Sequence, residues 1–394
     1  MINRLLEDRI LKALQHFPAA AILGPRQAGK TTLAKMIRGH LVKESFYLDL
    51  ENPDDQVLLT EPFKFFQANS EKCIIIDEIQ RKPDLFPLLR SAIDQDRQPG
   101  RFILLGSASA ELLFISSETL TGRIIYTELT PFLICEIWTL KTVQDHWLFG
   151  GFPQPFLIEK EDFRYEWFRS FFMTYVERDF RMIGLGALPA NLSRFFSMLA
   201  HIHGNILNKS MLAKSLALNL ATINTYLNYF KQAFLIRELS PWHQNIGKRL
   251  VKSPKIYVRD SGLLHYLLKI KNYNDLLGHP AFGNSWEGYV IEQIISCIGD
   301  SYEYYYYRTQ DGTEADLMIV QGNKPKYTIE IKFSSSPKLS KGFITAIRDL
   351  GTSRNFIIVP EVRQSYSLSD NITVHDLNGF IKFFHGQEHS DNNN

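Results

Sequence analysis

The chain has 394 residues, of which 45% are hydrophobic and 22% are charged, and its formal net charge is +2. This length predicts two or three domains, and the composition is typical of globular proteins. The near balance of charge excludes a strong overall field for nucleic acid or for an acidic membrane. The three cysteines lack CxxC spacing, which argues against a disulfide framework or a structural zinc site. No apolar run could span a bilayer, so we expect a cytoplasmic protein that does not contact membranes.

The first region, 1–149, predicts an α/β domain. It opens with an amphipathic helix, and short β-rich runs then alternate with helical segments. This alternation is typical of a parallel sheet with helices on both faces. The expected strands are AAAILG, SFYLDL, KCIIID, RFILLG and RIIYTEL.

A phosphate-binding loop follows the first expected strand and precedes a helix, where the pattern GxxxxGK[ST] runs from Gly24 to Thr31. Its glycines let backbone amides point at phosphate, Lys30 places a cation on the outer phosphates, and Thr31 can ligate magnesium. We therefore expect ATP and Mg²⁺ as cofactors. The expected nucleotide-binding residues are Gly24, Pro25, Arg26, Gln27, Ala28, Gly29, Lys30, Thr31 and Thr32.

Polar residues at the ends of later strands extend this site. Asp77 ends an apolar strand and would hold the magnesium shell, and Glu78 would polarise the attacking water. Ser107 ends the next strand, where it could sense the γ-phosphate. Arg123 could stabilise transition-state charge in cis or in trans, although an ordinary salt bridge is the alternative.

Several segments together resemble a known family: GPRQAGKTT, FYLDLENPD, CIIIDEIQ, FILLGSASAELL, SETLTGRI and ELTPFLICEI. They are similar to the prokaryotic AAA-type ATPases that precede a C-terminal domain of unknown function. The resemblance continues through GGFP and TYVERDF and so covers most of the chain. It implies a three-layer α/β core in which one strand separates the two Walker strands. Glu177, Arg178 and Asp179 match the recurrent YxERD segment of that family, which we expect to form a hinge between modules.

A helical connector, 150–189, and a helical module, 190–260, are expected next. The helical module has three helices, a strand and a turn with Gly247, Lys248 and Arg249, which is the outline of a winged helix. Its third helix offers polar side chains for DNA but little positive charge, so a structural or protein-binding role stays open. The polar candidates are Thr222, Asn224, Thr225, Asn228 and Lys231, and the nearby cations are Lys209, Lys214, Lys248, Arg249, Lys252 and Lys255.

The region 261–386 predicts a second α/β domain, and 387–394 a disordered tail. Asp316 on one expected strand and Glu330 and Lys332 on the next have the D…ExK spacing of restriction-endonuclease-like folds. Two such carboxylates can hold a divalent metal, Lys332 can orient a water, and Glu287 on the preceding helix could add a ligand. The alternatives are a charged wet face of a strand and a metal-free cluster neutralised by lysine.

The fold class predicted here is α/β: a P-loop AAA-type sheet, a winged-helix module and a restriction-endonuclease-like domain. We expect an ATPase that couples ATP hydrolysis to its C-terminal region and associates with DNA. The rival hypothesis is a nucleotide-dependent switch that binds a protein partner and uses the C-terminal fold as a scaffold, and a third is a metal-dependent nuclease gated by ATP. A homo-oligomer is compatible with each of these hypotheses.

Overall fold

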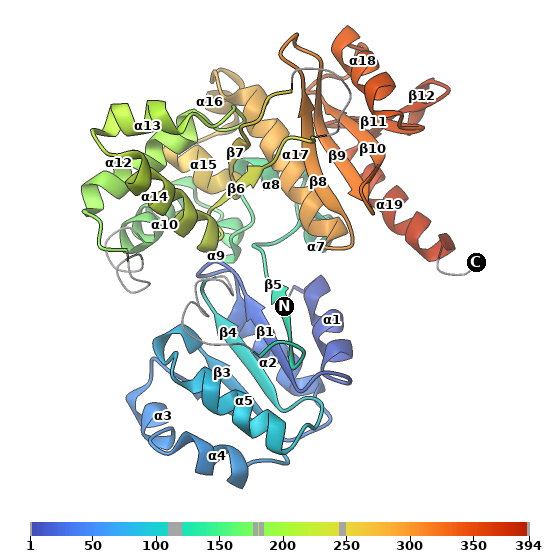
Figure 1. Cartoon of the computed structure of the whole chain (residues 1–394). Coiled ribbons are helices and arrows are strands. Elements are labelled where there is room, and N and C mark those ends of the chain that lie inside the picture. The colour runs from blue at the N-terminus through green and yellow to red at the C-terminus, as the bar shows by residue number, and fades with distance from the viewer. Residues whose placement is uncertain (1, 109–119, 176–179, 181–184, 244–249, 392–394) are drawn as a thin grey trace.

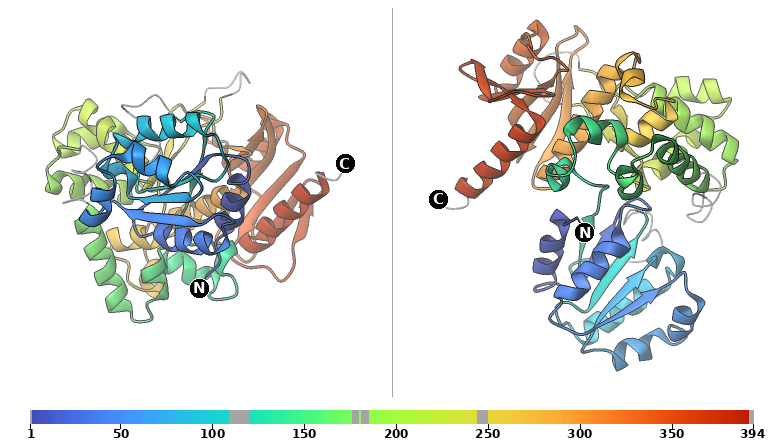
Figure 2. Two further views of the ribbon diagram at one scale, coloured as in Figure 1. Left: turned by 90° about the horizontal axis from the view of Figure 1, so that it is seen from below. Right: turned by 180° about the vertical axis from the view of Figure 1, so that it is seen from behind.

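A computed structural model of the chain describes residues 2–108, 120–175, 180, 185–243 and 250–391. The first sheet and its helices form one lobe, and the remaining modules lie side by side above it (Figure 1). The view from behind shows the same division (Figure 2).

The first lobe is built on a five-stranded sheet with the order β2-β3-β4-β1-β5. All of its strand pairs are parallel, which confirms the five expected strands. Strand β4 lies between β1 and β3, as the family resemblance implied. The strands are β1 Ala19–Leu23, β2 Ser45–Asp49, β3 Cys73–Asp77, β4 Phe102–Gly106 and β5 Ile124–Glu128.

Helices cover both faces of this sheet, because successive side chains of a strand point to opposite faces. Ile74 and Ile76 of β3 join one apolar core with α4 and α5, whereas Ile75 joins another with α1 and α2. Strand β3 is therefore apolar on both sides, as parallel strands usually are. The helices are α1 Leu5–Ala13, α2 Lys30–His40, α3 Pro53–Leu58, α4 Pro62–Ala68, the short 3₁₀ helix η1 Ile79–Arg81 and α5 Leu85–Gln95.

The connector and the helical module follow in the expected order. Three helices, α12, α13 and α14, precede two antiparallel strands, β6 and β7. The bounds are α7 Ile134–Ile137, α8 Val143–Phe149, α9 Pro153–Leu157, α10 Glu161–Thr174, α12 Pro189–His201, α13 Lys209–Leu216, α14 Leu220–Gln232, β6 Ile236–Leu239, β7 Lys255–Val258, α15 Ser261–Leu267 and α16 Tyr273–Leu277. The winged-helix assignment stays a prediction.

The last module has a six-stranded mixed sheet with the order β12-β13-β11-β10-β9-β8. Strands β10, β11 and β13 are mutually parallel, and β8 and β9 form antiparallel pairs at one side. The bounds are α17 Phe282–Ile298, β8 Glu303–Arg308, β9 Glu314–Gln321, β10 Lys324–Ile331, α18 Lys341–Leu350, β11 Arg354–Val359, β12 Tyr366–Ser369, β13 Ile372–Asp376 and α19 Leu377–Asp391. The sequence analysis missed β12 and β13, and α19 extends to Asp391, into the segment 387–394 that was expected to be a disordered tail.

One apolar core joins the helical module to the last sheet. This core contains Phe132, which precedes α7, together with Phe230 of α14, Val290 of α17 and Phe384 of α19. The predicted boundary between 260 and 261 therefore divides segments that share a core. None of the helices described in the structure is long and apolar enough to cross a membrane.

Candidate functional site

The phosphate-binding loop lies at the carboxyl edge of the first sheet, between β1 and α2. Gly24 has φ +156°, and a Cβ there would lie 2.2 Å from the carbonyl oxygen of Leu129. Gly29 has φ +98° and precedes α2. The first glycine is needed for close backbone packing, and both adopt a conformation that L side chains rarely take. The loop thus leads into a helix N-terminus, which favours anions.

Lys30 is folded back onto its own loop. Its Nζ donates hydrogen bonds to the carbonyl oxygens of Gly24 at 3.0 Å and Pro25 at 2.9 Å. Burial lowers the pKa of Lys30 to about 8, while Glu78 and Asp77 act in the opposite direction. To contact a phosphate, the lysine would have to exchange these carbonyl oxygens for phosphate oxygens.

Thr31 and Asp77 lie together, as a magnesium site requires. The Thr31 hydroxyl donates to Asp77 Oδ2 at 2.7 Å, and the Tyr47 hydroxyl donates to the same oxygen at 2.5 Å. Tyr47 was missed by the sequence analysis, although its position on β2, next to β3, follows from strand order. Burial, followed by the hydrogen bond to Asp77, raises the pKa of Tyr47. A hydroxyl and a carboxylate are oxygen donors that suit Mg²⁺.

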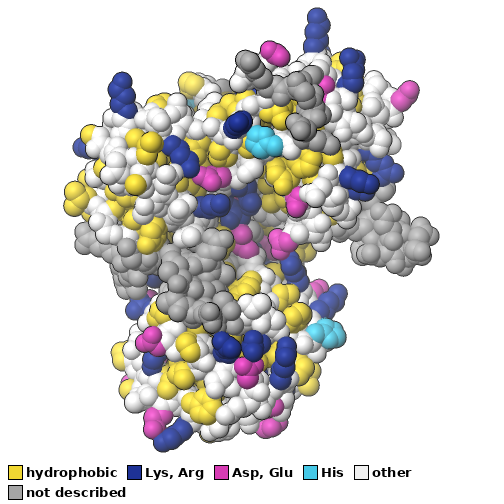
Figure 3. Space-filling view, viewed as in Figure 1, with side chains coloured by type: hydrophobic (Ala, Val, Ile, Leu, Met, Phe, Trp, Pro, Cys, Tyr) yellow, Lys and Arg dark blue, Asp and Glu magenta, His cyan; other side chains and the backbone are white. Residues whose placement is uncertain are grey.

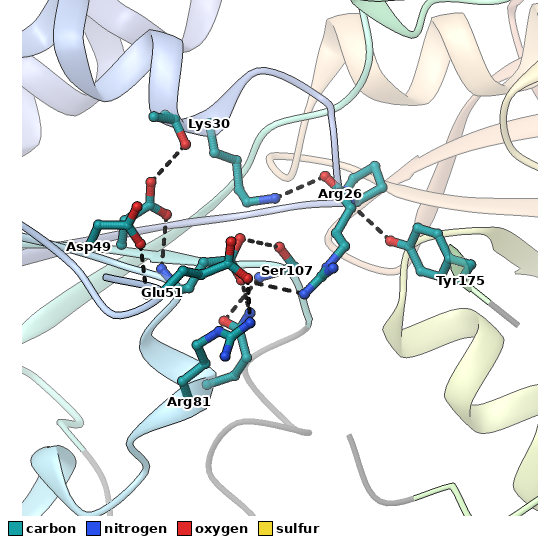
Figure 4. Close-up of polar contacts among 12 residues, drawn as sticks. Arg26, Lys30, Asp49, Glu51, Arg81, Ser107 and Tyr175 are labelled. Carbon is teal, nitrogen blue, oxygen red and sulfur yellow. Dashed lines mark hydrogen bonds and ion pairs between the residues drawn. The ribbon is translucent and has the colours of Figure 1, made fainter. Parts of the chain in front are cut away.

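Glu78 follows β3 in a left-handed conformation with φ 56°. Ser107 Oγ donates to Glu78 Oε1 at 3.3 Å, the Gln80 side-chain amide donates to Oε2, and the Arg26 guanidinium lies 4.0 Å away. The side chains of Arg26 and Ser107, both labelled in Figure 4, reach this carboxylate from different elements. Ser107 is thus placed at the site, where it contacts Glu78. Gln80 was missed, although it lies two residues after Glu78.

Two further residues tie the loop to other parts of the chain. Arg4, which is 7% exposed, donates to the carbonyl oxygen of Ala28 at 3.1 Å and pairs with Glu136 at 3.0 Å. The backbone N–H of Arg26 donates to the hydroxyl of Tyr175 at 2.9 Å. Arg4 has no local sequence signal, because its contacts join distant segments. Tyr175 is the tyrosine of the YxERD segment, but that motif does not indicate a contact with the phosphate-binding loop.

Arg123 lies away from this site. It precedes β5, whose first residue pairs with the start of β1, so it is at the opposite edge of the sheet from the loop. Its guanidinium pairs with Asp94 at 2.6 Å. That hydrogen bond raises the pKa of Arg123 and lowers the pKa of Asp94. A role in cis is therefore wrong for this conformation, and a role in trans stays a prediction.

The expected nuclease-like residues meet a lysine from another module. Antiparallel pairing of β9 with β10 brings Asp316 and Glu330 onto neighbouring strands at the same end of the pair. Lys255 of β7 lies 2.9 Å from Glu287, 2.8 Å from Glu314 and 4.0 Å from Asp316. Its side chain is 4% exposed.

These contacts place one buried ammonium group among three carboxylates. Burial would lower the pKa of Lys255, but the carboxylates raise it above its ordinary value. The pKa of Asp316 is raised, first by burial and then by Glu287. Lysine therefore compensates the like charges that a metal usually compensates.

Glu330 and Lys332 form a separate pair. Their atoms Oε1 and Nζ lie 3.2 Å apart, and Ser340 donates to the same Glu330 oxygen at 2.7 Å. In the part of the chain that the structure describes, no group of three or more His, Cys, Asp or Glu side chains could hold a metal ion. The metal-binding role of Glu287, Asp316 and Glu330 stays a prediction, and the lysine-neutralised alternative has the better geometric support.

The expected DNA contacts are only partly described. Lys248, Arg249 and the YxERD residues 177–179 lie outside the described residues. Lys209 donates to Asn224 at 2.8 Å, Lys231 lies 3.8 Å from Glu238, and Lys255 is buried. These three cations therefore already have partners within the protein.

Comparisons with known proteins agree with this arrangement. A model described as an AAA domain matches residues 16–138, and two models of domains of unknown function, DUF8612 and DUF4143, match residues 140–274 and 282–380. The uncharacterized protein Rv2008c of Mycobacterium tuberculosis is 38% identical over 366 residues, which are 93% of this chain and 81% of the relative. The uncharacterized protein MJ1544 of Methanocaldococcus jannaschii is 24% identical, covering 89% of this chain and 82% of the relative.

Among solved structures, the Walker-type ATPase PABY2304 of Pyrococcus abyssi matches with a TM-score of 0.47 and 15% identity, over 68% of this chain and 96% of that one. A structure of a RuvB variant from Thermotoga maritima matches with a TM-score of 0.30 and 19% identity, over 60% of this chain and 89% of that one.

The P-loop, the strand order and the AAA-domain match define the first lobe as an AAA-type P-loop domain. The identity and coverage of the mycobacterial relative then place the whole chain: it belongs to the family of AAA-domain proteins that includes Rv2008c of Mycobacterium tuberculosis.

Proposed function

We propose that this protein hydrolyses ATP and transmits the state of its nucleotide site to the C-terminal region. The observation that carries the proposal is the hydrogen bond from the Arg26 N–H of the phosphate-binding loop to the Tyr175 hydroxyl. Tyr175 follows α10 and is 4% exposed, so it is anchored in the core of the C-terminal region.

Arg26 links the Tyr175 contact to Glu78. Its backbone bonds to Tyr175, and its guanidinium lies 4.0 Å from Glu78, which we assign as the residue that polarises the attacking water. Backbone N–H groups of such a loop point at a bound phosphate. If the Arg26 N–H turns toward phosphate it leaves the Tyr175 hydroxyl, which Figure 4 shows reaching Arg26 from a different element.

The geometry supports the remaining roles in this proposal. Lys30 would turn from its loop carbonyls to the outer phosphates, and Thr31 and Asp77 would hold Mg²⁺. Glu78 would accept a proton from water, and its hydrogen bonds from Ser107 and Gln80 fix its orientation. When bound, Mg²⁺ supplies charge neutralisation for the phosphates.

DNA cleavage has weaker support than nucleotide-dependent switching. Lys255 satisfies the carboxylates that a nuclease would use for metal, and it is not free to meet phosphate. On the face shown in Figure 3, Lys and Arg side chains are scattered among acidic ones rather than gathered in one patch. We therefore favour a protein partner over a nucleic acid for the C-terminal region.

The test is ATP turnover together with hydrogen exchange of α10, each measured with and without nucleotide. Turnover by the wild type, and exchange at α10 that changes with ATP, are the expected results. Tyr175→Phe should retain turnover within a few-fold and abolish the change at α10, because it removes one hydrogen bond. Tyr165→Phe, on the same helix, is the matched control. Absence of turnover would refute the ATPase, and an α10 response that survives in Tyr175→Phe would refute this route of coupling.

A further inference from the structure

Tyr47 of β2 lies on the face of the first sheet that α2 covers. Its register partner on β3 is Ile75, and Asp77 lies two residues further along β3. Residues two apart on a strand share a face, so Ile75 and Asp77 both face α2. The Tyr47 ring packs against the apolar core that contains Ile75 and Leu33 of α2. The core therefore holds the ring in place, and the Tyr47 hydroxyl reaches Asp77 at 2.5 Å.

Asp77 is 4% exposed, and its two carboxylate oxygens differ in how many hydrogen bonds they accept. The hydroxyls of Tyr47 and Thr31 both donate to Oδ2, at 2.5 Å and 2.7 Å. In the described part of the chain, Oδ1 accepts only the N–H of Glu78, at 2.9 Å. A carboxylate oxygen has two lone pairs, so the two hydroxyls fill Oδ2 and Oδ1 keeps one lone pair. Asp77 thus has one defined oxygen left for the shell of a cation.

The same hydrogen bonds orient Thr31. A hydroxyl group has one proton and two lone pairs, and the Thr31 proton is directed to Asp77. Its lone pairs are therefore the part of the group that can meet a cation. Tyr47 has a different place in the arrangement, because its proton also goes to Asp77 but its ring lies in the core. It would act on a cation through Asp77, and a phenol stays protonated at neutral pH, so the donor is always present.

A fixed carboxylate favours one kind of divalent cation. Mg²⁺ demands a near-ideal octahedral arrangement of oxygen atoms, whereas Ca²⁺ accepts more ligands in a flexible arrangement. Without the Tyr47 hydroxyl, Oδ2 would keep only the donor from Thr31, and the carboxylate could turn or offer a second oxygen. That change would harm the site for Mg²⁺ more than for Ca²⁺.

We propose that Tyr47 is a positioning residue that fixes Asp77 for Mg²⁺ and makes the nucleotide site prefer Mg²⁺ to Ca²⁺. The inference rests on the nucleotide site of the proposed function, and it adds a residue that lies outside the phosphate-binding loop and outside the pair Asp77 and Glu78. The alternative is a purely structural tyrosine that only satisfies a buried carboxylate. The two readings differ in whether loss of the hydroxyl depends on the cation.

The experiment measures the affinity of the full chain for a fluorescent, non-hydrolysable ATP analogue in Mg²⁺, in Ca²⁺ and in EDTA. The wild type should bind the analogue about tenfold more tightly in Mg²⁺ than in Ca²⁺. Tyr47→Phe keeps the ring in the core and should weaken binding in Mg²⁺ about tenfold, as expected for a lost hydrogen bond to a charged group. Its affinity in Ca²⁺ and in EDTA should change about twofold or less.

Tyr307→Phe is the matched control, because the Tyr307 hydroxyl also donates to a carboxylate, that of Asp349, at 2.9 Å in the last sheet. It should leave all three affinities unchanged, and thermal unfolding checks that both variants fold. Equal wild-type affinity in Mg²⁺ and Ca²⁺, or a loss in Tyr47→Phe that is absent or the same in all three conditions, would overturn the inference and leave the ATPase standing. A wild type that binds the analogue in none of the conditions would refute the proposed function as well.

Discussion

Two clusters of carboxylates, one at the first sheet and one at the last sheet, differ in the side chains that contact them. At the first sheet, Asp77 accepts hydrogen bonds from two hydroxyl groups and from the backbone N–H of Glu78, and Lys30 is turned toward loop carbonyls. At the last sheet, Lys255 already lies between Glu287 and Glu314. A divalent cation would enter the first group without displacing a charged side chain, whereas at the second it would have to displace Lys255.

This difference shows that carboxylate spacing does not define a metal site by itself. Asp77 and Asp316 both lie on strands of α/β sheets and have suitable neighbours in sequence. The distinguishing residue, Lys255, comes from a different module and is separated from Asp316 by several helices and a strand. Four experiments test this comparison, and they are given in order of decreasing expected effect.

Lys30→Ala should reduce ATP turnover roughly a thousandfold, about 4 kcal/mol, because it removes the cation assigned to the outer phosphates. Lys35→Ala, an exposed position on the same helix, is the matched control and should keep turnover. Glu78→Gln should retain ATP binding and slow hydrolysis. The turnover rate and the nucleotide affinity are measured for each variant. Wild-type turnover in both Lys30→Ala and Glu78→Gln would show that the assigned site is wrong.

Lys255→Met should lower the free energy of unfolding by about 3 kcal/mol, because it leaves buried carboxylates without their counter-charge. Denaturant unfolding measures this change, with the exposed Lys252→Met as control. Added Mn²⁺ should then stabilise Lys255→Met and leave the wild type unchanged, since metal would replace the ammonium. Stabilisation of the wild type by Mn²⁺ would instead support a functional metal site at Asp316.

Acid should destabilise the C-terminal region before the AAA lobe. Burial lowers the pKa of His146 and His265 to about 4 and of His203 to about 3, below the unfolded value near 6.5. Their neutral forms are favoured on folding, so the stabilisation is present above pH 6.5 and is lost as pH falls toward 4. Each contributes a loss of about 1.4 kcal/mol per pH unit in that window. His16 and His40 of the AAA lobe are exposed.

Tryptophan fluorescence can follow this order, because all five tryptophans lie at residue 138 or later. The fluorescence transition should move to lower denaturant between pH 7.5 and 5.5, and His203→Gln should reduce the pH dependence. Nucleotide binding, measured in parallel, follows the unfolding of the AAA lobe. Parallel loss of both signals, with no effect of His203→Gln, would contradict this assignment.

Arg123→Ala should change ATP turnover by about twofold or less at low protein concentration, because its ion pair with Asp94 is exposed. Asp94→Ala is the control that removes the same pair and keeps the arginine. A large loss in Arg123→Ala alone, growing with protein concentration, would establish a role in trans and an oligomeric ATPase.

Local patterns were sufficient for much of the fold and for the centre of the first site. The five strands of the AAA lobe could be predicted because each is a short apolar run between helical segments. The loop from Gly24 to Thr31 could be predicted because a phosphate-binding loop uses backbone atoms of residues that are adjacent in the sequence. Strand β12 was missed because it is exposed along its length and has little apolar signal.

The sequence by itself determined which residues could do chemistry: Lys30, Thr31, Asp77 and Glu78 at the nucleotide site. Only the tertiary structure decided which charges they and the other carboxylates meet. It brought Tyr175 to Arg26, placed Arg123 with Asp94, and put Lys255 among the carboxylates of the last sheet. The physical reason is that electrostatic neutralisation depends on distance in space, and these partners come from segments whose separation along the chain carries no local pattern.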